Sequence, residues 1–148
     1  CAEAKRATRR RGGTDSYEER DKIWAVFDRD QHLRYEEAID LCRRHNVDVA
    51  RSNPCFELWL ILHETDYDKP DGGHAVQRHL RTLRPEYDPH GTKTVDCADL
   101  INRIAAAEQR SAAQLIRREQ DGTPFGNPST TVGNLIRAIL DAAKGGTP

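Results

Sequence analysis

The sequence predicts an α/β fold, and the prediction rests on three neighbouring segments. Residues 23–28, IWAVFD, are a run of apolar, β-branched and aromatic residues, typical of a strand buried on both faces. Residues 34–45 then place apolar side chains at helical spacing, and residues 47–50 predict a second, short strand. Strand, helix and strand within about 30 residues indicate a right-handed βαβ unit with two parallel strands.

The next segment, residues 52–64 (SNPCFELWLILHE), predicts a helix that is apolar nearly all round. Such a helix is expected to be deeply buried. Ser52 or Asn53 is suited to cap it, and Pro54 suits its first turn.

Three further helices are predicted in the second half of the chain. A short helix is expected over residues 73–83, and a long one begins at Asp96 and carries an imperfect apolar stripe to Leu115. Ser129 or Thr130 is suited to cap a last helix, whose apolar residues follow clean helical spacing. Two strands alone do not make a stable core, so we expect more strands in a missing N-terminal portion or in the loops.

Size and composition place limits on the kind of protein. The 148 residues suit one domain, and the net charge of −1 gives no overall bias towards polyanions. The four cysteines show no zinc-ligand spacing, and no apolar run reaches membrane-spanning length. A cytoplasmic protein without membrane contact is expected. The chain begins with Cys1 and contains no methionine, so a fragment is expected.

Two carboxylates follow the predicted strand directly, Asp28 and Asp30. If the extended conformation continues through Asp30, both side chains point to the same side at the carboxyl end of the strand, where open α/β sheets bind ligands. Two converging carboxylates suit Mg²⁺ or Mn²⁺. The alternative is a strand-end turn, in which aspartate is common for conformational reasons.

Glu57 lies within the apolar run of the predicted buried helix. A buried charge is costly without partners, so Glu57 is expected either to sit in the first helical turn, stabilised by the helix dipole, or to be a third acidic group at the strand ends.

The remaining candidates are weaker. His63 is a core histidine or a site residue, and Lys93 is a surface lysine or a phosphate contact. The basic run of residues 5–11, which includes Arg9, Arg10 and Arg11, is a solvated face or a nucleic-acid contact. Asn53, beside the predicted acidic site, is a further candidate.

Three motifs in this order resemble the RloB-like family of bacterial phage-defence proteins: FDRD after the strand, SNPCFELWLILH, and NPSTTV before the last helix. They cover residues 17–140. The resemblance implies a Toprim-like domain, a parallel sheet flanked by helices whose acidic groups bind Mg²⁺ and support phosphodiester chemistry. Asp28 and Asp30 match the acidic pair, Glu57 matches the acidic position of the middle motif, and the family's early glutamate has no match.

The resemblance therefore implies a Mg²⁺-dependent nuclease that acts on RNA, including tRNA, or on DNA. Catalysis would fall to Asp28, Asp30 and Glu57, and Arg9, Arg10, Arg11 and Lys93 would contact nucleic acid. The alternative is a non-catalytic module that binds a partner ATPase, and a homo-oligomer is also open. We expect one Toprim-like domain over residues 1–148, with an acidic βαβ core in residues 17–65 and a helical part in residues 66–148.

Overall fold

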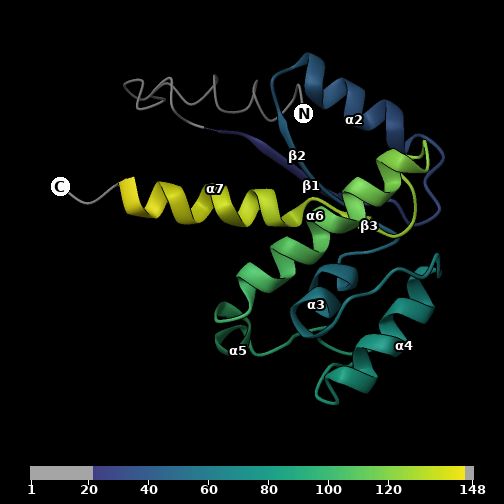
Figure 1. Cartoon of the computed structure of the whole chain (residues 1–148), viewed down its shortest axis with the longest axis vertical. Helices are drawn as coiled ribbons and strands as arrows, with labels where there is room; N and C mark the ends of the chain where they lie inside the picture. Colours follow the sequence, from purple (N-terminus) through teal and green to yellow (C-terminus); the bar gives the residue numbers. More distant parts are fainter. Residues whose placement is uncertain (1–21, 146–148) are drawn as a thin grey trace.

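A small three-stranded sheet and six helices make up the described part of the chain, residues 22–145, in a computed structural model (Figure 1). The mixed α/β class is confirmed. The elements run in the order β1 (Trp24–Asp28), α2 (Tyr35–Arg44), β2 (Asp48–Asn53), α3 (Glu57–Glu64), α4 (Gly73–Leu83), α5 (Cys97–Ile101), α6 (Ile104–Gln120), β3 (Ser129–Thr130) and α7 (Val132–Gly145).

The predicted βαβ unit is present. β1 and β2 pair in parallel, with Trp24 opposite Asp48 and Asp28 opposite Ser52. Between them, α2 turns the side chains of Tyr35, Ile39 and Cys42 inward, as its apolar spacing predicts. Figure 1 shows α2 on one side of the strands and α3 and α4 on the other.

The prediction that β1 is buried on both faces is wrong. Its burial is intermediate, and Val26 exposes 57% of its surface. Within residues 22–145, β1 pairs with β2 alone and therefore lies at an edge of the sheet. An edge strand covered on one side has less apolar surface to bury than a central one, so the apolar run predicts the strand correctly and its environment incorrectly.

The two segments predicted as helix caps are largely strand. β2 extends beyond residue 50 to Asn53, so neither Ser52 nor Asn53 caps α3, and no side chain caps that helix. Ser129 and Thr130 form β3, which pairs antiparallel with the end of β2. Thr130 still has the expected contact, because its hydroxyl accepts the backbone N–H of Val132, the first residue of α7.

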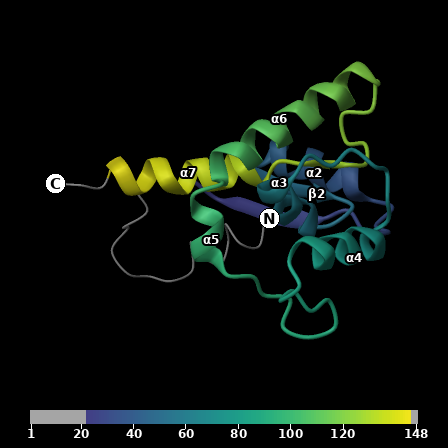
Figure 2. The ribbon, with the colours of Figure 1, turned by 60° about the horizontal axis from the view of Figure 1, so that its bottom comes forward.

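The largest cluster of buried apolar side chains lies among the helices. It joins residues of α3, α4, α5 and α6 and of the segments before and between them with Val132 of α7, and it includes no residue of β1, β2 or α2. Figure 2 shows α3 between α6 and α4. The helix α3 is buried as predicted, with Leu58, Ile61 and Leu62 fully inaccessible. A sheet this small is stable because the helices bury most of the apolar surface.

The helix predicted from Asp96 is two helices. Asp96 caps the first, α5, by accepting the backbone N–H of Ala98. The chain then turns at residues 102–103 before α6 begins. Arg103 in this turn forms an ion pair with Asp99, four residues earlier, and another with Glu64 of α3. The contact with Glu64 joins distant parts of the chain, which a helical stripe does not encode. No helix in residues 22–145 is long and apolar enough to cross a membrane.

The buried position of α3 gives a stability prediction. Ile61→Ala should lower the free energy of unfolding by about 3 kcal/mol, because it removes a fully buried side chain and leaves a cavity. Ile116→Ala, at a position 58% exposed in α6, is the matched control and should cost less than about 1 kcal/mol. Urea denaturation measures both. If both variants lost the same free energy of unfolding, the placement of α3 at the centre of the helical core would be contradicted.

Candidate functional site

The acidic residues after β1 lie at the carboxyl ends of the two parallel strands. Beyond Asp28 the chain continues along β2, where the Arg29 N–H donates to the Ser52 carbonyl over 2.8 Å and the Asp30 N–H to the Pro54 carbonyl over 3.0 Å. The first turn of α3 follows immediately and contains Glu57. We call Asp28, Asp30 and Glu57 the acidic edge.

Asp28 and Asp30 do not continue one extended strand. β1 ends at Asp28, and Asp30 has a φ of 42°, in the left-handed region that aspartate enters more readily than most residues. The side chain of Asp30 turns towards the start of α4, because an ideal Cβ on Gly73 would lie 3.6 Å from its Oδ1. The prediction that strand geometry aligns the two carboxylates is therefore wrong. They nevertheless line one hollow of about 620 Å³, together with His32 and Tyr35.

Asp28 is the acid whose charge is least well accommodated. Burial raises its pKa from 3.8 to about 6, and the charges of Asp30 and Glu57 act in the same direction. The backbone N–H of Phe56 and the charge of Lys93 oppose this shift. Asp28 therefore changes protonation state close to neutral pH, which is unusual for an aspartate and common in functional sites.

Glu57 is held in place by hydrogen bonds. Its side chain is buried, and its Oε1 accepts the Tyr87 hydroxyl over 2.6 Å and the Gln77 Nε2 over 3.1 Å. Burial alone would raise its pKa, but the hydrogen bonds from Tyr87, Cys55, its own backbone and Gln77 lower it below the usual value. It does not line the hollow that Asp28 and Asp30 share. Its position suits a fixed negative charge behind Asp28.

Asp30 borders two further hollows, each of about 550 Å³. Lys93, a predicted phosphate contact, lines one of them with three histidines: His32, His74 and His90. Arg29, Asn53 and Asn127 line the other. His74, His90 and Arg29 were not among the site residues predicted from the sequence. No spacing motif marks them, because loops and helix starts far apart in the chain bring them together.

Of the other predicted residues, Asn53 lies beside a hollow that Asp30 borders, and His63 lies in the core. Asn53 is buried, and its Nδ2 donates to the Phe125 carbonyl over 2.8 Å. His63 is a core histidine of α3, with Nδ1 2.9 Å from the Trp59 carbonyl and its ring edge-on to that of Trp59. Arg9, Arg10 and Arg11 lie outside the described residues.

The fit to a divalent cation is limited to the aspartate pair. No group of three or more His, Cys, Asp or Glu side chains in residues 22–145 is arranged to hold a metal ion. Mg²⁺ in enzyme sites, however, is commonly held by one or two carboxylates, with waters and substrate phosphates completing its coordination. Asp28 and Asp30, whose charges repel across a shared hollow, fit that mode.

Comparison with known protein families gives a match over most of the chain. A family model described as RloB-like protein matches residues 2–139. No curated protein and no solved structure gives a significant match.

The raised pKa of Asp28 predicts a stability change. Ionised Asp28 is less stable in the folded chain than in the unfolded chain. The free energy of unfolding therefore falls as the pH rises from about 4 through about 6. Asp28→Asn keeps an acceptor for Phe56 and removes the charge. It should raise the free energy of unfolding by about 1–2 kcal/mol at about pH 7.5, allowing for partial exposure, and by little at about pH 4. Urea denaturation at the two pH values measures this.

Asp40→Asn removes an exposed carboxylate from α2 and is the matched control. The raised pKa would be contradicted if Asp28→Asn increased the free energy of unfolding equally at both pH values, or decreased it at the higher one.

Proposed function

Because this chain belongs to the RloB-like protein family, we propose that it is a Mg²⁺-dependent nuclease-like effector of bacterial phage defence that hydrolyses phosphodiester bonds in RNA or DNA. The observation that carries the proposal is the pair Asp28 and Asp30 lining one hollow at the carboxyl ends of parallel strands, with the pKa of Asp28 raised to about 6. The Toprim-like arrangement, with further strands and an earlier glutamate, is part of the proposal.

The two aspartates share one task in this scheme, and Glu57 has another. Asp28 and Asp30 hold the cation, which when bound supplies Lewis-acid neutralisation of phosphate charge. The Phe56 N–H fixes the carboxylate of Asp28, and Glu57, immobilised by Tyr87 and Gln77, keeps a negative charge behind it. Ionised Asp28 is the form that would bind a cation, so at a Mg²⁺ concentration that does not saturate the site, activity is expected to rise as the pH passes about 6.

Substrate binding would use the basic groups around Asp30. Lys93 and the histidines at positions 32, 74 and 90 line the adjoining hollow, where they suit the phosphates of a nucleic-acid strand. Arg29 and Arg78 line the neighbouring hollow, which Asp30 also borders. The basic residues Arg9, Arg10 and Arg11 are proposed to extend this contact, and residues 17–65 to form the acidic core of one domain with residues 66–148.

The proposal predicts that Asp28→Asn and Asp30→Asn each lower Mg²⁺-dependent cleavage of single-stranded RNA or DNA by about 10²-fold or more, because each loses charge stabilisation at the phosphate. Asp40→Asn, on the exposed side of α2, should cleave at the wild-type rate. Radiolabelled oligonucleotides with and without Mg²⁺ measure the rates. Unchanged cleavage by a folded Asp28→Asn variant would rule out the proposed site.

A non-catalytic module that binds a partner ATPase is the second candidate. The observation favouring it is that α7 exposes two large apolar side chains in its middle, Ile139 at 55% and Leu140 at 42%, and that this helix extends past the others (Figure 1). This candidate predicts that Asp28→Asn keeps full protection of cells against phage and that Ile139→Asp abolishes it. A plaque assay separates the two, since the nuclease proposal predicts that protection is lost in Asp28→Asn.

A further inference from the structure

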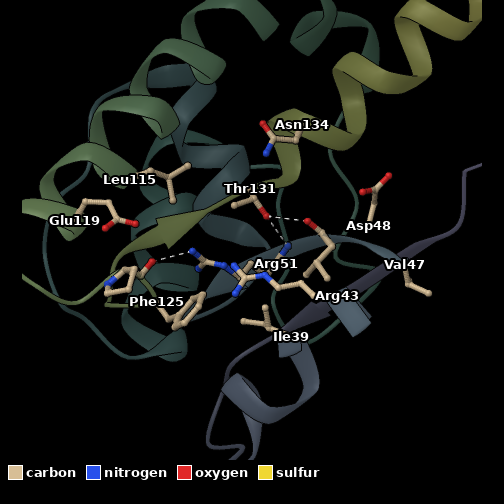
Figure 3. Close-up of a pocket in the computed structure, with 12 residues that line it drawn as sticks. Ile39, Arg43, Val47, Asp48, Arg51, Leu115, Glu119, Phe125, Thr131 and Asn134 are labelled. Atoms are coloured by element: carbon tan, nitrogen blue, oxygen red, sulfur yellow. Dashed lines mark hydrogen bonds between the residues drawn. The ribbon is translucent and has the colours of Figure 1, made fainter. Parts of the chain in front are cut away.

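Another cavity shares no lining residue with the three hollows that Asp30 borders, and two arginines line it. It measures about 680 Å³ and opens between α2, β2, the end of α6 and the start of α7 (Figure 3). We call it the arginine cavity, and its lining consists of Ile39, Arg43, Val47, Asp48, Val49, Arg51, Leu115, Glu119, Pro124, Phe125, Thr131 and Asn134. No residue of the acidic edge is among them, so it is a separate site.

Arg51 is the central feature of the arginine cavity. It exposes only 6% of its surface, and its guanidinium donates to the Ser129 hydroxyl over 3.0 Å, the Pro124 carbonyl over 2.9 Å and the Tyr35 hydroxyl over 3.5 Å. All three acceptors are neutral. Among the ion pairs formed by residues 22–145, none includes Arg51.

The other buried arginine among the described residues is paired with carboxylates, as buried arginines usually are. Arg84 exposes 8% of its surface and is paired with the carboxylates of Glu64 and Asp99. A buried cation without a carboxylate is costly, and an anion supplied from outside the chain would remove that cost. The contrast between Arg84 and Arg51 is therefore the first sign of an anionic ligand.

Arg43 brings a second cation to the same place. Its guanidinium carbon lies 5.6 Å from the centre of the Phe125 ring, and that of Arg51 lies 5.0 Å from the same centre. One aromatic ring thus holds two guanidinium groups at one cavity. Within residues 22–145, Arg43 forms an ion pair with Asp40 at 3.5 Å, on an exposed surface where such a pair contributes little. Two guanidinium groups match the charge and geometry of a phosphate dianion.

The rest of the lining suits a larger molecule than phosphate alone. Asp48, Glu119 and Asn134 offer acceptors for hydroxyl groups, and Ile39, Val47 and Leu115 offer apolar surface. The volume lies within the range of small-molecule sites. We infer that the arginine cavity binds a small phosphomonoester of mononucleotide size, with its phosphate on Arg43 and Arg51.

Calorimetric titration of the intact chain in EDTA tests this. EDTA removes any divalent cation through which the acidic edge could hold phosphate, and the Arg43→Ala variant distinguishes the arginine cavity from the hollow that Lys93 lines. Inorganic phosphate and AMP should bind, and adenosine should not. Arg43→Ala should weaken AMP binding at least about tenfold, because it removes a charge-assisted contact. Arg44→Ala removes the same charge from the neighbouring position of α2, outside the arginine cavity, and should bind AMP like the wild type.

A second variant is expected to bind phosphate more tightly, a result that misfolding would not produce. Glu119→Gln removes a negative charge from the cavity wall and should tighten phosphate binding at least about twofold. Asp28→Asn should leave AMP binding unchanged. Three outcomes would overturn the inference: no binding of phosphate or AMP at millimolar concentration, adenosine binding as tightly as AMP, or equal affinities in the Arg43→Ala and Arg44→Ala variants.

Discussion

The parallel pairing of β1 with β2 determines where every polar group of the acidic edge lies. The register sets Asp28 beside Ser52, and the following backbone bonds carry the chain past Pro54 to the first turn of α3. Asp28 thereby comes close to the Phe56 N–H and to the charge of Glu57. The burial of α3 in the helical core fixes the other side of this arrangement, so strand pairing and helix burial together hold three carboxylates in a small volume.

The three carboxylates are stabilised to different degrees. Glu57 has hydrogen-bond donors from α4 and from Tyr87, which keep it charged, whereas Asp28 has one backbone donor and two neighbouring negative charges. This difference in pKa is typical of sites in which one acid changes its protonation state or binds a cation while another keeps a constant charge. The proposed function depends on this asymmetry more than on the number of acids.

Local patterns in the sequence predicted the local structure well. The βαβ unit, the burial of α3 and the bounds of α4 follow from apolar spacing and turn residues. The site was predicted less completely. The left-handed φ of Asp30 is a property of one residue in a turn, and the hydrogen bond from Tyr87 to Glu57 joins positions 30 residues apart. The arginine cavity likewise depends on Phe125 meeting two arginines from α2 and β2, which no spacing rule encodes.

In this account, burial and the neighbouring negative charges disfavour the ionised form of Asp28, and a bound divalent cation would favour it. Carboxyl-carbon NMR of Asp28 as a function of pH, with and without Mg²⁺, tests it most directly. The account predicts a pKa of about 6 in the absence of Mg²⁺ and a fall of at least about one unit when Mg²⁺ is added, because the cation favours the charged form. A pKa near 4 without Mg²⁺, or one that Mg²⁺ does not move, would contradict it.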